Sequence, residues 1–249
     1  MNKQLRTILD RKEVVYNLFL TQPSTWIAEQ LGVWGFETLT LDLQHTLIEP
    51  AHWLGMMQAI QAGGSIPLAR LPWNRPEYIM RALDYGVQGL ICPMIETAAD
   101  VEAFVKAAKY PPQGNRSFGP IRAGLYGGPN YFEEANQQIV VFAMIETAAA
   151  LENIEAIAQV PGLDGIYLGP FDLTASLGFP ERANFADPKL QDIIKKILTV
   201  AGQNRLYTGV FTVDTTNAQS MADKGFDLVT IGTEGILFRE KIMKTLQVL

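Results

Sequence analysis

The sequence predicts an α/β fold and, within that class, a (β/α)8 TIM barrel. Short β-branched runs alternate with segments of helical periodicity along the whole chain, and no Ser/Pro-rich linker separates them. The chain has 249 residues, the size expected for eight such βα units. A doubly wound sheet usually shows a glycine fingerprint after its first strand, but "LFLTQPST" at that place has no G-x-G-x-x-G pattern. We therefore expect one barrel domain over residues 1–249.

Eight strands are expected, each a short apolar or β-branched run before a helical segment. In chain order they cover residues 14–20, 37–43, 65–70, 89–94, 139–146, 164–169, 207–211 and 227–232. The terminal segment "ILFREKIMKTLQVL" is amphipathic and predicts a C-terminal helix. Its apolar face needs a partner, so we expect this helix to pack on its own barrel or to be exchanged with a neighbouring subunit.

Composition and charge argue against several classes of partner. Hydrophobic residues make up 48% of the chain and charged residues 18%, which is typical of soluble globular proteins. A net charge of -6 without a basic run argues against nucleic acid as a partner. Charged residues at positions 10–13 interrupt the apolar residues near the N-terminus, and no later run is long enough to span a bilayer. We expect a cytoplasmic protein without a nucleic-acid or membrane partner.

Polar side chains gather where the expected strands end. The hexapeptide "MIETAA" occurs at 94–99 and again at 144–149, which places Glu96 and Glu146 near two such ends. TIM barrels carry their chemistry at the carboxyl ends of the strands, and neighbouring strands lie about 4.8 Å apart. Glu96, Glu146 and Asp172 could therefore converge on one hard cation, and spacing alone leaves open which of them hold it. The full set of strand-end residues is Asp42, Gln44, His45, Arg70, Glu96, Glu146, Asp172 and Glu234.

Two covalent mechanisms are disfavoured. The lysines fall on helical segments rather than at strand ends, where a Schiff base would need one. The single cysteine, Cys92, lies in the apolar run "GLICPMI" and is expected to be a buried thiol. Of the two histidines, His52 follows Pro50 at the start of a helix and is expected to pack there. His45 follows a strand and stands three residues after Asp42, where an imidazole oriented by a carboxylate can act as general base, although it could also cap the next helix.

Three stretches carry a family resemblance: "GFETLTLDLQH", "PLARLPWNRPEYIMRALDYGVQGLICPMIETAADVEAFVKAAKYPPQGNRSFGPIRA" and "MIETAAALENIEAIAQVPGLDGIYLGPFDLTASLG". In order and spacing they resemble the HpcH/HpaI aldolase family, the metal-dependent pyruvate aldolases, from about residue 14 to the end of the chain. The resemblance implies a (β/α)8 barrel and a divalent cation, Mg²⁺, Mn²⁺ or Co²⁺. It also implies reversible aldol cleavage of a 4-hydroxy-2-oxo acid into pyruvate and an aldehyde.

The resemblance assigns roles to individual residues. By position, the metal ligands of the family match Glu146 in "AMIET" and Asp172 in "GPFDL". Glu96 does not match a ligand position, so we expect it to support the metal ligands from outside the coordination sphere or to lie at the rim of the site. The catalytic dyad matches His45 and Asp42, and the substrate-binding arginine matches Arg70. The turn expected to bind the substrate carboxylate contains Gly169, Pro170, Phe171 and Asp172, of which Pro170 has no N–H to donate.

Four positions bear on how this chain differs from other members. Gln44 stands where many members carry glutamate, and Glu234 stands where aspartate is common. Arg122, in "GPIRAG", is a candidate for binding the distal part of the substrate, with a structural role equally open. Phe211 stands near a pocket-lining aliphatic position and would narrow the site for the aldehyde.

The resemblance also implies a homo-oligomer, a hexamer built as a trimer of dimers. Asp84, in "ALDYG", resembles a residue that reaches the substrate site of a neighbouring subunit. Three alternative functions remain open: an oxaloacetate decarboxylase, a CoA-thioester lyase of the same superfamily, and a catalytically inactive barrel that acts as a binding subunit. The presence of all five central residues, Asp42, His45, Arg70, Glu146 and Asp172, argues against the inactive barrel.

Overall fold

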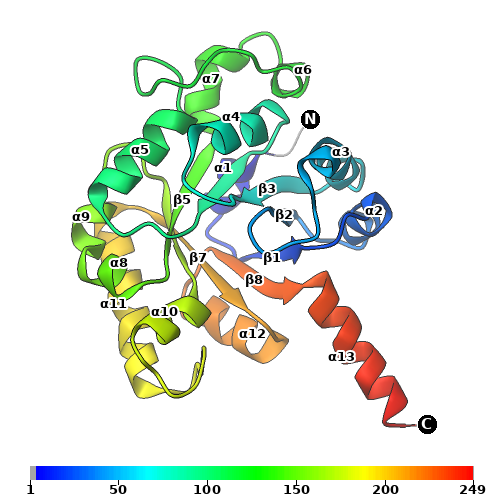
Figure 1. Cartoon of the computed structure of the whole chain (residues 1–249), viewed down its shortest axis with the longest axis vertical. Helices are drawn as coiled ribbons and strands as arrows, with labels where there is room; N and C mark the ends of the chain where they lie inside the picture. Colours follow the sequence, from blue (N-terminus) through cyan, green and yellow to red (C-terminus); the bar gives the residue numbers. More distant parts are fainter. Residues whose placement is uncertain (1–3, 249) are drawn as a thin grey trace.

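Eight parallel strands pair in chain order and close into a barrel in the computed structural model, which describes residues 4–248 (Figure 1). All eight expected strands are present, and their ends differ from the expected ones by no more than two residues. The strands are β1 (Val15–Leu20), β2 (Thr38–Asp42), β3 (Ile66–Arg70), β4 (Gly89–Cys92), β5 (Val140–Ile145), β6 (Gly165–Leu168), β7 (Tyr207–Thr212) and β8 (Leu228–Thr233). The predicted α/β barrel is therefore confirmed.

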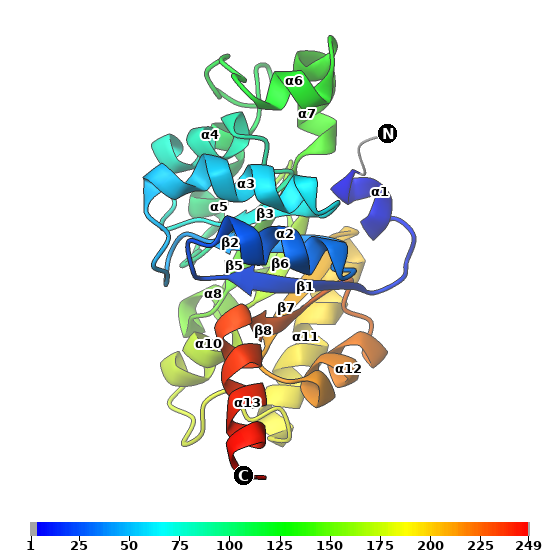
Figure 2. The same cartoon turned by 90° about the vertical axis from the view of Figure 1, so that its right-hand side faces the viewer.

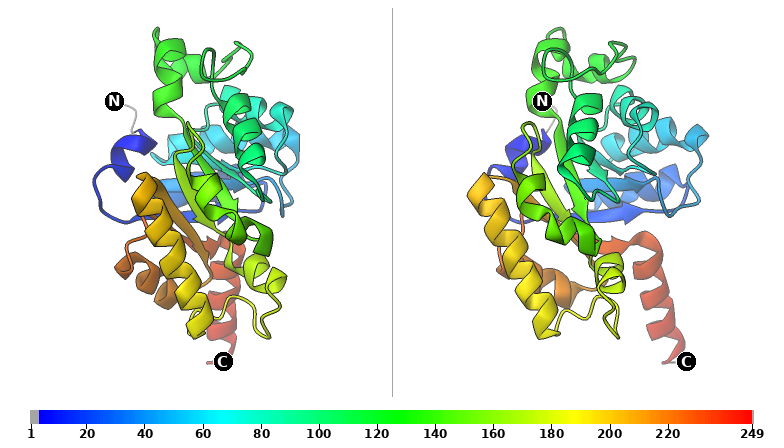
Figure 3. Two further views of the ribbon diagram at one scale, coloured as in Figure 1. Left: turned by 90° about the vertical axis from the view of Figure 1, so that its left-hand side faces the viewer. Right: turned by 60° about the vertical axis from the view of Figure 1, so that its left-hand side comes forward.

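Helices follow the strands and cover the outside of the barrel (Figures 2 and 3). They are α1 (Leu5–Leu9), α2 (Thr25–Val33), a 3-10 turn η1 (Pro50–His52), α3 (Trp53–Ala62), α4 (Pro76–Asp84), α5 (Ala98–Ala108), α6 (Ala123–Gly127), α7 (Tyr131–Gln138), α8 (Ala148–Glu152), α9 (Ile154–Ala158), α10 (Pro170–Ser176), α11 (Pro188–Asn204), α12 (Thr215–Asp223) and α13 (Glu234–Leu246). Across residues 4–248, none of these helices has both the length and the apolar character needed to cross a membrane.

The side chains of each strand alternate between the barrel interior and the layer of helices, because a strand repeats every two residues. In β5, Val140, Phe142 and Met144 belong to the interior cluster, and the residues between them pack outward. On β6, Gly165 leaves room for the Phe142 ring, since a Cβ there would lie 2.5 Å from two of its carbons. The residue after β5 on the inward file is Glu146, which therefore points into the barrel mouth.

Helix α1 closes the amino-terminal end of the barrel, an element that the sequence patterns did not predict. Its residues Leu5, Ile8 and Leu9 are fully or almost fully buried and join the interior cluster. Arg6 holds the helix in place through an ion pair of 2.6 Å with Asp164, which directly precedes β6. With this end closed by apolar side chains, the opposite end is left for polar chemistry.

Helix α13 extends away from the barrel (Figures 1 and 2). Its first residue, Glu234, follows β8 without a loop and is the one buried residue of the helix. Apolar side chains farther along are exposed, Phe238 by 70% and Leu246 by 60%. Only the first turn of this helix packs on its own barrel, where Leu237 contacts the core, and exchange of the rest with a neighbouring subunit stays a prediction.

Cys92 lies on the outward face of β4 and is fully buried among apolar side chains. Burial raises the pKa of its thiol, because the thiolate would lose its hydration. We expect the native protein to react very slowly with DTNB, and one thiol per chain to react at once after unfolding in guanidinium chloride. Absorbance at 412 nm measures both, and rapid labelling of the folded protein would contradict the outward, buried placement of this strand position.

Candidate active site

Asp42 and Arg70 form the centre of the barrel mouth. They end β2 and β3, are direct partners in the strand register, and lie on the inward file of each strand. The guanidinium of Arg70 donates from Nε to Asp42 Oδ1 at 2.9 Å and from Nη2 to Oδ2 at 2.6 Å. Only 2% of the Asp42 side chain is exposed, so this bidentate ion pair is shielded from water and geometrically fixed.

Asp42 holds the His45 loop through its backbone. Its Oδ1 accepts hydrogen bonds from the backbone N–H of Gln44 at 3.1 Å and of His45 at 3.3 Å. The sequence predicted that this carboxylate would orient the imidazole itself, but Arg70 and the two amides already occupy its oxygens. Asp42 therefore fixes the backbone position of His45. The imidazole itself lies at the exposed rim of the mouth.

A cavity of about 180 Å³ opens beside this ion pair. A water molecule takes about 30 Å³ in the liquid, so the cavity has the size of a small organic acid. Five of the residues predicted to bind substrate or perform chemistry lie on its wall, whereas Asp42 lies behind Arg70. The cavity is lined by His45, Arg70, Met144, Gly169, Pro170, Phe171, Asp172 and Phe211.

Glu146 is almost completely buried next to this cavity. Its Oε1 accepts a hydrogen bond of 2.7 Å from the backbone N–H of Met94, whose backbone has the left-handed φ of 54° that a side chain disfavours. Burial raises the pKa of Glu146 to about 7; the Asp172 charge adds to the rise, and the Met94 amide and Arg70 oppose it. A side chain at position 169 would crowd Glu146, because a Cβ there would lie 2.9 Å from both the Cβ and Oε2 of Glu146.

Glu146 and Asp172 fit a divalent cation. Within residues 4–248 no group of three or more histidine, cysteine or carboxylate side chains forms a ready metal cluster, so the candidate set is this pair. Burial is the main cause of the raised pKa of Glu146, and the Asp172 charge adds to it; a cation held by both carboxylates would offset these costs of a negative charge. Two carboxylates are oxygen donors that hard cations prefer, and they leave coordination positions open for substrate and water.

The two copies of "MIETAA" play different parts. Glu146 directly follows the last residue of β5, whereas Glu96 stands four residues after Cys92, which ends β4. Glu96 is not part of the cavity wall; its backbone N–H donates to Asp100 Oδ2 at 3.2 Å. What the copies share is the threonine: Thr97 caps α5 and Thr147 caps α8. Sequence reasoning missed that the first copy supplies the Met94 amide that holds Glu146.

Comparison with known proteins agrees with this geometry. The model of the HpcH/HpaI aldolase/citrate lyase family matches residues 16–240, which is most of the chain. The chain belongs to this family. A hydroxypyruvate/pyruvate aldolase of Rhizorhabdus wittichii is 35% identical over 92% of this chain and 91% of its own length. A 2-keto-3-deoxy-L-rhamnonate aldolase of Salmonella gallinarum is 33% identical over 90% of this chain and 85% of its own. The chain is accordingly an aldolase, a lyase of the HpcH/HpaI family.

Solved structures of the family share the barrel. A HpcH/HpaI aldolase/citrate lyase family protein from Burkholderia cenocepacia superposes with a TM-score of 0.89 at 29% identity, over 97% of this chain and 96% of that chain. A more distant citrate lyase β subunit from Mycobacterium tuberculosis, with 18% identity over 90% of this chain and 93% of its own, has a TM-score of 0.57. That protein was solved in complex with oxaloacetate and magnesium.

Two predicted substrate-binding residues of this HpcH/HpaI member, Asp84 and Arg122, lie far from the mouth. Helix α4 runs back from the carboxyl end of β3, so Asp84 at its end lies near the amino-terminal end of β4, where it accepts from Arg116 at 2.7 Å. Arg122 donates to the Tyr85 carbonyl at 2.7 Å and to the Gln61 side chain. Neither residue lines the mouth cavity of its own chain. A role of Asp84 in a neighbouring subunit and contact of Arg122 with the distal part of a substrate both stay predictions.

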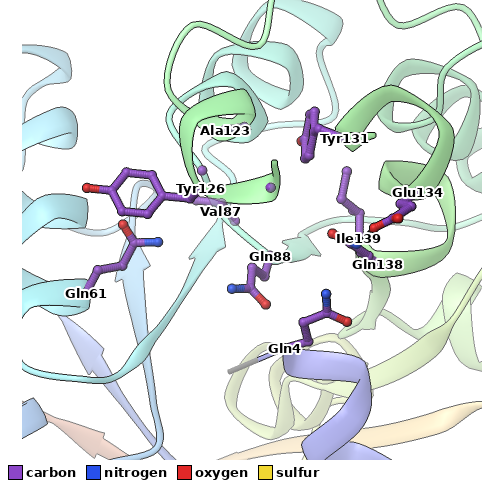
Figure 4. A pocket seen from close by; sticks show the side chains of 12 residues that line it. Gln4, Gln61, Val87, Gln88, Ala123, Tyr126, Tyr131, Glu134, Gln138 and Ile139 are labelled. Atoms are coloured by element: carbon purple, nitrogen blue, oxygen red, sulfur yellow. Dashed lines mark hydrogen bonds between the residues drawn. The ribbon is translucent and has the colours of Figure 1, made fainter. Parts of the chain in front are cut away.

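A second hollow, of about 100 Å³, is lined by Gln61 and by Ala123, the residue after Arg122 (Figure 4). Gln61, Gln88 and Tyr126 point toward it from α3, from the turn before β4 and from α6. It lies at the end of the barrel that α1 closes, and none of the residues predicted for catalysis or metal binding lines it. The residues predicted for catalysis and metal binding therefore lie at the opposite end of the barrel, on or next to the mouth cavity.

Substitution of Gly169 by alanine tests the metal site without replacing either of the proposed ligands, Glu146 and Asp172. The added Cβ would push on Glu146, so we expect Mn²⁺ affinity to fall by about tenfold to a hundredfold, the usual range for groups that orient a ligand. Isothermal titration of the metal-stripped protein measures the change. Gly202→Ala is the matched control, because its Cβ meets open space on α11. Equal Mn²⁺ affinity in both variants would contradict the predicted crowding of Glu146.

Proposed function

We propose that this aldolase uses a divalent cation to cleave a 4-hydroxy-2-oxo acid reversibly to pyruvate and an aldehyde. The observation that carries the proposal is the convergence of Glu146, Asp172, Arg70 and His45 around one small cavity. The pyruvate donor is consistent with the name of the Rhizorhabdus relative, a hydroxypyruvate/pyruvate aldolase, and the 2-oxo acid substrate with the name of the Salmonella relative.

The reaction needs stabilisation of negative charge. Breaking the bond between C3 and C4 of such an acid leaves carbanion character at C3 of the pyruvate fragment. A divalent cation, Mg²⁺, Mn²⁺ or Co²⁺, held by Glu146 and Asp172 would act as a Lewis acid toward the developing enolate. The buried Glu146 is kept in place for this task by the Met94 amide, so little reorganisation is needed when the cation binds.

Arg70 and the start of α10 would bind the carboxylate of the substrate. Asp42 accepts from Nε and Nη2 of the guanidinium and not from Nη1, and Arg70 lines the cavity. The amides of Phe171 and Asp172 lie in the first turn of α10, after Pro170, where helical N–H groups have no partner within the helix. A planar cation and backbone donors on two sides suit a carboxylate, and they supply positive potential in a protein of net charge -6.

His45 would act on the hydroxyl at C4. Its imidazole lies at the rim of the cavity, and its backbone N–H is fixed by Asp42. A neutral imidazole at this place can take the hydroxyl proton during cleavage and return it during addition. The dyad in this chain is thus a carboxylate that positions the loop and an imidazole that exchanges the proton.

A homo-oligomer belongs to the same proposal. The exposed apolar side chains of α13 need a partner, and Asp84 and Arg122 are too far from the mouth cavity of their own chain to serve it. A hexamer built as a trimer of dimers would cover the helix and bring these residues to another subunit's site.

The aldehyde would lie against aromatic side chains. Phe171 and Phe211 line the cavity, with ring centroids 6.1 Å apart, and Phe211 also packs on Phe19 at 5.3 Å. We expect Phe211→Leu to raise the ratio of kcat/KM for a long to that for a short aldehyde by about tenfold, since shape selection by an apolar pocket amounts to about 1–3 kcal/mol. Aldol addition with pyruvate and aldehydes of graded length measures this ratio. An unchanged ratio would remove Phe211 from the acceptor site.

The donor half of the proposal is tested with pyruvate alone. Metal-stripped protein in D₂O should exchange the methyl protons of pyruvate only after Mg²⁺, Mn²⁺ or Co²⁺ is added, as proton NMR would show. Glu146→Gln should lower the exchange rate by about a hundredfold or more, because it removes a charged ligand. The matched variant Glu96→Gln, in the other copy of the hexapeptide, should keep a measurable part of it.

Two results would contradict this reading. Equal loss in the Glu146 and Glu96 variants would mean that both carboxylates serve the metal. No exchange by the folded wild type with any of the three cations would remove pyruvate as donor, and would favour oxaloacetate decarboxylation, a thioester donor or an inactive barrel.

A further inference from the structure

Glu234 is a buried carboxylate that lies outside the cavity wall and outside the mechanism above. It is the first residue of α13, directly after β8, and its Oε1 accepts hydrogen bonds of 2.7 Å from the backbone N–H groups of both Thr21 and Gln22. The Thr21 hydroxyl lies 3.3 Å from each of its oxygens. No lysine or arginine pairs with Glu234 in residues 4–248, so backbone donors of the loop after β1 compensate its charge.

Thr21, which Glu234 holds through hydrogen bonds, in turn accepts hydrogen bonds from the loop that carries His45. The carbonyl oxygen of Thr21 accepts from the Thr46 hydroxyl at 3.0 Å and from the backbone N–H of Leu47 at 2.9 Å. Thr46 and Leu47 are the two residues that follow His45. The Glu234 carboxylate at the start of α13 is therefore linked to the His45 loop through a single residue, Thr21.

The backbone around His45 is held from both sides. On one side, Asp42 accepts from the amides of Gln44 and His45; on the other, Thr21 accepts from Thr46 and Leu47. Asp42 is fixed by Arg70, and Thr21 is fixed by Glu234. Two carboxylates at opposite ends of the same chain, neither bonded to the imidazole, together determine the position of this loop.

We propose that Glu234 is a positioning residue for His45 and acts through Thr21. The proposal rests on the assignment of His45 as the proton-transferring group. A carboxylate suits the position because one ionised oxygen can accept from two successive amides, and charge-assisted bonds of this kind are the strong ones. Helix capping does not account for Glu234, since the N-cap of α13 is Thr233, whose hydroxyl accepts from the Ile236 amide at 3.2 Å.

The two histidines of the chain make this inference directly measurable. Labelling with ¹⁵N-histidine gives two backbone amide signals, one from His45 and one from His52. The His45 amide donates to Asp42 and reports the loop, while His52, in η1 and bonded to Glu49, is the internal control. At constant pH without metal, we expect Glu234→Gln to shift or broaden the His45 signal and to leave His52 unchanged.

Two further variants separate positioning from stability. Thr46→Val removes the hydroxyl that bonds Thr21 and leaves Glu234 and its amide partners intact, so it should reproduce the change at His45. Glu240→Gln removes the same charge from an exposed part of α13, where its partner is Lys244, and should change neither signal. In turnover, Glu234→Gln should lower kcat by about tenfold to a hundredfold with KM within about twofold, because misplacement affects the proton transfer more than binding.

An unchanged His45 signal in both Glu234→Gln and Thr46→Val would overturn the proposal, even if their melting temperatures fell. If Glu234→Gln does not fold, Thr46→Val alone decides between the two outcomes. A wild-type protein without aldol activity whose His45 signal responds as expected would support the positioning role and reject the proposed function. The two hypotheses therefore fail separately.

Discussion

The alternation of side chains in a closed barrel is the constraint from which the rest of this structure follows. Every second residue of a strand must face the interior, and the interior file runs from apolar residues such as Phe142 to Glu146 on one strand, and from Leu68 to Arg70 on another. Because the strands are parallel, these polar ends meet at one mouth. The opposite end is closed by the apolar face of α1. The inward-facing positions of the strands thus supply apolar side chains to the core and, at the carboxyl ends, polar side chains to the candidate active site.

Buried carboxylates tie the loops of the mouth to one another. Asp42 accepts from the backbone of the His45 loop, Glu146 from Met94 after β4, and Glu234 from Thr21 after β1. A buried negative charge is costly unless donors surround it, and here the donors are amides of neighbouring loops. Asp42 thus holds the loop that follows its own strand, whereas Glu146 and Glu234 hold loops that follow other strands. This arrangement holds the mouth in place, although loops on a protein surface are usually its most mobile part.

The repeated hexapeptide shows which structural features a local sequence pattern determines and which it does not. Both copies start a helix, and in both the threonine caps it, because capping depends only on residues three positions apart. The position of the glutamate side chain differs between the two copies, because it depends on where the preceding strand ends. Strand β4 ends four residues before Glu96, and β5 ends at the residue before Glu146. The same six letters thus yield one buried carboxylate beside the cavity and one outside its wall.

The sequence by itself determined the eight strands, their order and the set of polar strand ends, because a two-residue period and helix-start signals are local properties of the chain. The family resemblance added the roles of residues such as His45 and Arg70. Only the tertiary structure decided that Asp42 holds the backbone of His45 rather than its ring, that Met94 bonds Glu146, and that Asp84 and Arg122 lie at the far end. The Asp42 contact is local, but Arg70 on the next strand fixes its carboxylate, and the other contacts join segments more than 30 residues apart in the chain. They depend on register and on the direction in which each helix returns, neither of which a local pattern encodes.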